Sequence, residues 1–232
     1  MSKKAFDDFD EFATDYRQIH NETIKFSGAD SDFFSEQKVE EVRKNENQDN
    51  LSILDLGCGD GNSAIFFQKH FPDSKYLGLD VSQESIAVAK TKTLPNAEFS
   101  HYNGFDLPSE DNSLDIVFIA CVLHHINFDN HEKVLGEVRR VLKPNGRLYI
   151  FEHNPFNPVT RKVVRDCPFD EDAVLLSPFY TKKTLSKVGF RQTNVNYTIF
   201  FPRTKMLNWA LPLENYLKWL PMGGQYYTRS IK

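Results

Sequence analysis

Residues 51–61 place an acid and several glycines where a ligand could approach the main chain. The segment holds them at alternate positions: Asp55, Gly57, Gly59 and Gly61. Asp80 ends a second apolar run, about 20 residues further on. A ligand can come close to a glycine because no Cβ stands in its way. An acid at this distance can accept hydrogen bonds from ribose hydroxyls. The pattern predicts a strand, a glycine turn and a helix that together bind a nucleoside.

The spacing within the loop separates two kinds of cofactor. Dinucleotide-binding loops follow the pattern G-x-G-x-x-G, which directs a helix N-terminus at a pyrophosphate. Here Asn62 stands where the third glycine of that pattern would be, and the loop carries both Asp55 and Asp60. Two carboxylates repel a pyrophosphate and attract a cation. The loop therefore disfavours a nicotinamide-dependent dehydrogenase and favours a positively charged nucleoside.

Taken together, the glycine loop, Asp80 and the segment Phe99–Pro108 resemble the class I S-adenosylmethionine (SAM)-dependent methyltransferases, over roughly residues 50–200. The resemblance implies SAM as cofactor and S-adenosylhomocysteine as product. It implies a Rossmann-like α/β fold whose doubly wound seven-stranded sheet is mostly parallel, with an antiparallel last strand. Helices would cover both faces, and an N-terminal helical cap would fold over the cofactor.

The apolar residues are spaced for alternating strands and helices. We expect strands at 51–56, 75–80, 97–102, 114–120, 146–152, 191–201 and 224–231, and helices at 5–20, 32–44, 62–70, 83–91, 130–142 and 182–188. Short connections between alternating elements favour a parallel sheet that is wound on both faces. We divide the chain into a cap (1–46) and a SAM-binding domain (47–232), with substrate-side segments at 153–180 and 202–222.

The resemblance also assigns the cofactor contacts. They fall on Asp55, Gly57, Cys58, Gly59, Asp80, Val81, Asn103, Gly104, Phe105, Ala120 and Cys121. The loop would cradle the methionine portion, Asp80 would hold the ribose, and Val81 and Phe105 would border the adenine. Asn103 stands where the family usually has Asp, and its side-chain oxygen can still accept a hydrogen bond from an amine.

Methyl transfer is an in-line displacement that depends chiefly on alignment of the reacting atoms. A general base is needed only where the nucleophile must lose a proton. His125 and His153 follow the fourth and fifth strands and are the candidate catalytic residues; the alternative is that they contact the cofactor or support a loop. His101 and His131 fit surface or structural roles better. No metal site is expected, because no thiol or third imidazole has suitable spacing.

Four residues are candidates for substrate contact. Tyr16 and His20 belong to the cap, although Tyr16 could instead pack within the cap core. Asn154 and Arg161 lie in a segment with two Asn-Pro pairs after the fifth strand, which predicts a stiff loop of extended or turn geometry. That loop could recognise an anion, or could be a rigid connector with solvated bases.

Residues 206–220 are apolar and aromatic, and Pro212 should break them into two short helices. Core packing or a dimer face is the default interpretation. The alternative is an apolar substrate entrance or a peripheral membrane contact. Trp209 and Trp219 would suit a membrane interface. Residues 139–232 hold 16 basic and 6 acidic residues, which favours an anionic substrate or surface. The core of the chain is also similar to that of quinone-biosynthesis methyltransferases, whose substrates are amphipathic.

These observations favour a methyltransferase acting on a small or lipid-like acceptor, with oxygen preferred and carbon close behind. The alternative is a SAM-binding module or partner subunit without activity. Nucleic acid is disfavoured, because the net charge is −4 and the N/D-P-P-Y/F motif is missing. Three scattered cysteines and the absence of an apolar leader predict a cytoplasmic protein. We expect it to be either a monomer or a homodimer.

Overall fold

The computed structural model of this 232-residue chain describes residues 21–170 and 173–232. The helix expected over residues 5–20 lies outside these ranges, as do the candidate substrate residues Tyr16 and His20. The division of the chain at residue 46 therefore stays a prediction.

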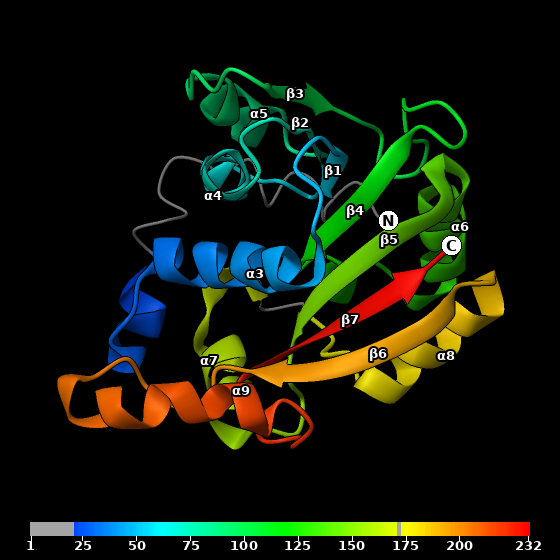
Figure 1. Cartoon of the computed structure of the whole chain (residues 1–232). Helices are drawn as coiled ribbons and strands as arrows, with labels where there is room; N and C mark the ends of the chain where they lie inside the picture. The colour runs from blue at the N-terminus through cyan, green and yellow to red at the C-terminus, as the bar shows by residue number, and fades with distance from the viewer. Residues whose placement is uncertain (1–20, 171–172) are drawn as a thin grey trace.

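Seven strands of the described residues form one sheet in the order β3-β2-β1-β4-β5-β7-β6 (Figure 1). They are β1 Ser52–Leu56, β2 Lys75–Asp80, β3 Ala97–His101, β4 Leu114–Ala120, β5 Leu142–His153, β6 Arg191–Thr198 and β7 Gln225–Ile231. Strands β1 to β5 pair in parallel, and β7 is antiparallel to both of its neighbours. The predicted fold class is confirmed.

Helices cover both faces of this sheet (Figure 1). One face carries α3 (Ser31–Asn45), α4 (Asn62–His70) and α5 (Gln83–Lys90), whose apolar residues join one buried cluster. The other carries α6 (Phe128–Val141) and α8 (Pro178–Val188), which join a second cluster. The remaining elements are η1 Lys25–Ser27, η2 Leu123–His125, α7 Pro158–Asp166, η3 Pro168–Asp170, η4 Lys205–Leu213 and α9 Glu214–Leu217.

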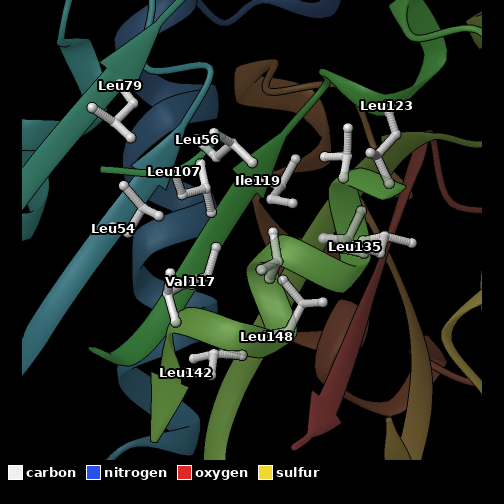
Figure 2. Packing of buried hydrophobic residues seen from close by; sticks show 14 of the residues in the cluster. Leu54, Leu56, Leu79, Leu107, Val117, Ile119, Leu123, Leu135, Leu142 and Leu148 are labelled. Carbon is white, nitrogen blue, oxygen red and sulfur yellow. The ribbon is translucent and has the colours of Figure 1, made fainter. Parts of the chain in front are cut away.

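The central strand β4 joins the two clusters. Its side chains alternate, so that Ile116 and Phe118 face the α3 side while Val117 and Ile119 face the α6 side. Figure 2 shows Val117 and Ile119 packed in the second of these clusters, with Leu135 of α6 close by. A strand covered on both faces must be apolar at nearly every position, and β4 is. This rigid centre holds the strand ends in place.

Local capping explains several helix boundaries. The Asp30 side chain accepts a hydrogen bond from Phe33 N and begins α3. Gly189 ends α8 in the left-handed conformation. Helix α7 was not expected. Asn157 caps it by accepting from the N–H groups of Val159 and Thr160, with Pro158 in the first turn. The second Asn-Pro pair thus starts a helix and does not extend a loop.

The aromatic segment 206–220 also departs from expectation. Pro212 lies inside η4, and α9 follows directly, so the proline does not separate two helices. Trp209 and Trp219 are each 74% exposed, which excludes core packing for these side chains. Among the described helices, none combines the length and the apolar character that a membrane crossing needs.

Candidate functional site

A cavity of about 410 Å³ lies where the carboxyl ends of four parallel strands meet. Asp55 of β1, Asp80 of β2, Ala120 of β4 and His153 of β5 all line it. Other parts of its wall come from η1, α3, α7 and the chain after β6. Doubly wound sheets bind ligands at this edge, and the volume suits a small-molecule site. The predicted cofactor residues that line it are Asp55, Gly57, Cys58, Gly59, Asp80, Val81, Gly104, Ala120 and Cys121.

Gly57 and Gly59 of the loop are required for different physical reasons. Gly57 has φ +81°, and a Cβ there would lie 2.4 Å from Cγ2 of Val122, the second residue after β4. Its N–H donates to Leu79 O of β2 at 2.7 Å. Gly59 has φ +53°, and no atom lies within 4 Å of the position its Cβ would take. Gly57 therefore lets the chain turn between two strands, while Gly59 leaves open space for a ligand.

The Asp80 carboxylate fixes the glycine loop against β2. Its Oδ2 accepts from Gly59 N at 2.8 Å, and its Oδ1 accepts from Ser82 N at 2.9 Å. Ser82, rather than Asp80, caps α5 by accepting from Ser85 N. A carboxylate has about four lone-pair positions, so these bonds leave room for further donors such as hydroxyls. Asp80 could hold a ribose and the loop at once.

The Asp55 carboxyl is buried behind the loop and accepts a hydrogen bond from Tyr76 OH at 2.5 Å. Burial raises the pKa of Asp55 to about 7; the charge of Asp80 also raises it, while Tyr76 and Lys38 oppose the rise. Its charge state therefore changes near neutral pH. A cationic ligand in the cavity would favour the ionised form.

Two predicted cofactor contacts are not supported by the geometry. The exposed Asn103 closes a turn, where its Oδ1 accepts from Phe105 N at 2.9 Å and Asp106 N at 2.8 Å. Phe105 packs under Lys133 Nζ, 4.4 Å from the ring centre, and does not line the cavity. The aromatic residue that does line it here is Tyr102, which sequence reasoning missed. Tyr102 directly follows β3, and that position was the available signal.

Three histidines gather at the β4 and β5 ends of the cavity. The His124 ring centre lies 4.2 Å from that of His125 and 5.4 Å from that of His153. His124 Nδ1 is 2.5 Å from Oε2 of the buried Glu152. Asp170 approaches from η3, with its Oδ1 3.5 Å from Nε2 of both His124 and His125. All three rings line the cavity, so the candidate bases are together.

The three histidines differ in pKa because their surroundings differ. Burial opposes a charge on His124, yet Glu152 and Asp170 raise its pKa well above the ordinary value. Burial and the neighbouring His124 lower the pKa of His125 to about 3 and that of His153 to about 4. His131 is structural, since its Nε2 lies 2.9 Å from both Leu123 O and Ile126 O.

The two residues after β5 that were predicted to contact the substrate do not line the cavity. Arg161 is exposed on α7 and does not line the cavity. Asn154 is fully buried, and its amide donates to Pro221 O and Gly223 O, so it braces a loop and faces no substrate. Lys38 of α3 lines the cavity and is only 7% exposed. Sequence reasoning missed it because a lysine on a charged helix usually faces solvent.

Comparison with known proteins finds similarity to methyltransferases. Residues 53–146 match a family of methyltransferase domains. Over 160 residues the chain is 34% identical to the demethylmenaquinone methyltransferase of Thermotoga maritima, covering 69% of this chain and 64% of that protein. Residues 53–146 therefore carry a methyltransferase domain. The chain is also 37% identical, over 118 residues, to the demethylmenaquinone methyltransferase of Lactococcus lactis, covering 48% and 46% of the two chains.

Solved structures share the fold of this chain. The crystal structure of a SAM-dependent methyltransferase from Thermotoga maritima superposes with a TM-score of 0.71 at 17% identity, covering 97% of this chain and 98% of that one. The curated relatives are matched over less of their length, since the alignment spans about half of the Lactococcus protein.

The cavity fits SAM, the cofactor of this family. Gly59 leaves open space beside the loop, and Asp55, Asp60 and Asp80 line a part of the wall that suits a sulfonium ion. Tyr102 and Val81 offer apolar surface for an adenine next to Asp80. These residues would hold the cofactor, whose reactive group is a methyl on positively charged sulfur.

We expect Asp80→Ala to weaken SAM binding by about 1–3 kcal/mol, because charge-assisted hydrogen bonds and the anchor of the Gly59 loop are both lost. Isothermal titration calorimetry measures the change, with Asp73→Ala in the exposed turn before β2 as the matched control. Unchanged affinity in Asp80→Ala would mean that this carboxylate does not hold the ribose.

The affinity for SAM, relative to S-adenosylhomocysteine, should rise several-fold between about pH 6 and pH 8. Asp55 has a raised pKa of about 7, so it is neutral at the lower pH and ionised at the higher one. The ionised form attracts the sulfonium, which the homocysteine compound lacks. Titrations at each pH test this, and Asp55→Asn should remove the rise. A rise that persists in Asp55→Asn would assign the effect to another group.

Proposed function

We propose that this protein transfers a methyl group from SAM to a small or lipid-like acceptor, with a hydroxyl oxygen preferred and carbon next. The observation that carries the proposal is a single cavity lined both by the glycine loop with Asp80 and by His125 and His153. Such a cavity can hold a methyl donor and an acceptor side by side. When bound, SAM supplies a methyl group on a sulfonium that leaves as a neutral thioether.

The protein's own residues would align the acceptor and receive its proton. Alignment of reacting atoms can supply several kcal/mol of the barrier reduction. An acceptor hydroxyl has to lose its proton as the oxygen–methyl bond forms, and a histidine ring nitrogen can accept it. His125 and His153 both line the cavity and are the candidates for this role. The apolar wall from Ile24, Phe33 and Phe34 would exclude water.

Lys38 supports an acceptor with negative charge. Lys38 extends from α3 and lines the cavity, and its Nζ donates a hydrogen bond to Phe34 O at 3.3 Å. Burial lowers the pKa of Lys38, which an anionic ligand would reverse. A phenolate or carboxylate is therefore a better partner for this site than a cationic amine. Residues 1–46 would form a cap over the acceptor, of which η1 and α3 are the described part.

An exposed aromatic patch favours a lipid-like acceptor taken from a membrane surface. The patch consists of Met206, Trp209, Leu213, Tyr216, Trp219 and Met222, which recur at intervals of three or four residues along η4, α9 and the turn after them. Residues 199–203, just before η4, line the cavity, so the patch adjoins its wall. The exposed bases Lys205 and Arg161 would complement anionic lipid. The likeness to demethylmenaquinone methyltransferases supports the same class of acceptor.

The function is tested by titrating the full chain with SAM, S-adenosylhomocysteine and NAD, and then by screening acceptors. We expect micromolar binding of both sulfur compounds, no binding of NAD, and methyl transfer to amphipathic phenols, with anionic members preferred over neutral ones of the same size. Binding without turnover on any acceptor would favour a non-catalytic SAM-binding module. Failure of folded protein to bind either sulfur compound would overturn the proposal.

The aromatic patch should bind vesicles of phosphatidylcholine that contain about one third phosphatidylglycerol, and bind neutral phosphatidylcholine vesicles less well. Replacing Trp209 and Trp219 together by Ser should weaken binding at least about tenfold, which corresponds to 1.4 kcal/mol. Co-sedimentation measures it, with Ile65→Ser, 38% exposed on α4, as control. Equal binding by the double variant and the original chain would show that the patch does not face lipid.

A further inference from the structure

Three potential metal ligands converge in the cavity wall, from two parts of the chain far apart in sequence. They belong to His124, His125 and Asp170, each of which offers one ligand atom, and these atoms all lie within 4.8 Å of one another. The Asp170 oxygen is 3.5 Å from each ring nitrogen. All three residues line the cavity. Two imidazoles and one carboxylate are a donor set that borderline divalent cations accept.

The spacing suits a shared ion better than direct hydrogen bonds. Ligand atoms bound at about 2.0–2.2 Å to a tetrahedral zinc ion lie about 3.3–3.5 Å apart. A separation of 3.5 Å is long for a hydrogen bond. His124 Nε2 is fully buried and has no hydrogen-bond partner among the described residues. A buried nitrogen aimed at a carboxylate without a bond to it needs a partner between them.

Glu152 orients the first of these ligands. Its Oε2 lies 2.5 Å from His124 Nδ1, and its Oε1 accepts from Leu123 N at 3.0 Å. The carboxylate thus holds a proton of His124 on Nδ1 and directs Nε2 at Asp170, where a bound cation would take the place of the Nε2 proton. Metal-binding histidines are commonly held in this way by a carboxylate on the other ring nitrogen.

We propose that His124, His125 and Asp170 bind a divalent cation of the Zn²⁺ type, with a further coordination position open to the cavity. Binding of the cation stands on this geometry alone. Its role rests on the proposed function: a cation there would bind an acceptor oxygen and favour its ionised form. With His125 engaged, His153 is the ring left to receive the acceptor proton. The proposal replaces the expectation from the sequence that the chain has no metal site.

The test is titration of the full chain with Co²⁺, whose visible absorption reports its coordination, followed by displacement with Zn²⁺ in a calorimeter. We expect one tight ion per chain and a tetrahedral Co²⁺ spectrum. Asp170→Asn and His125→Gln should abolish the spectrum, and Glu152→Gln should weaken affinity about 10–100-fold by releasing His124.

A second cluster provides the matched control. Glu36, Glu40 and His70 also bring three ligand atoms within 4.8 Å of one another, but they lie on partly exposed helix faces. His70→Gln should leave Co²⁺ binding unchanged. Loss of binding in His70→Gln with retention in Asp170→Asn would overturn the proposal, as would a chain that binds S-adenosylhomocysteine but no Co²⁺ or Zn²⁺.

The same samples are titrated with S-adenosylhomocysteine, so that the two proposals fail separately. If Asp170→Asn still binds S-adenosylhomocysteine, the variant is folded. The loss of its Co²⁺ spectrum then reports on the metal site. A chain that binds Co²⁺ through Asp170 but neither sulfur compound would support the metal site and overturn the proposed function.

Discussion

The order of the strands is the constraint on which the rest of this molecule depends. Strand β1 lies between β2 and β4, so the chain leaves β1 toward one face of the sheet and leaves β4 toward the other. A crevice must open where these connections diverge. Gly57 stands at that point, bonded to β2 through Leu79 O and packed against Val122 after β4. The position of the cavity is therefore a consequence of topology, and the side chains determine only how it is lined.

Charge is arranged along the cavity in two groups. Near the glycine loop, Asp55 and Asp80 give a negative wall that suits a sulfonium. At the ends of β4 and β5, Glu152 and Asp170 surround imidazoles. Lys38, with the opposite charge, enters from α3. Burial makes each of these charges count for more than it would in water, because there is less solvent to screen it.

The pattern of apolar residues was sufficient to predict the sheet. Helix α4 and strands β2 and β4 have the expected bounds, because glycine turns and polar loops interrupt the apolar runs sharply there. Strand β5 was harder. It starts at Leu142 rather than at residue 146, since residues 143–146 are absorbed as an irregularity in its pairing with β4. Helix α7 was missed because Asn-Pro is typical both of turns and of helix starts.

The sequence by itself determined the glycine loop, the alternation of strands and helices and the position of Asp80, because these depend on local spacing and on packing rules that hold across doubly wound sheets. Only the tertiary structure decided which side chains share the cavity. Asp170 meets His124 and His125 from more than 40 residues away, Lys38 turns inward, and Arg161 turns out to solvent. Such choices depend on how helices rotate and pack on the sheet, and a one-dimensional pattern does not record that rotation.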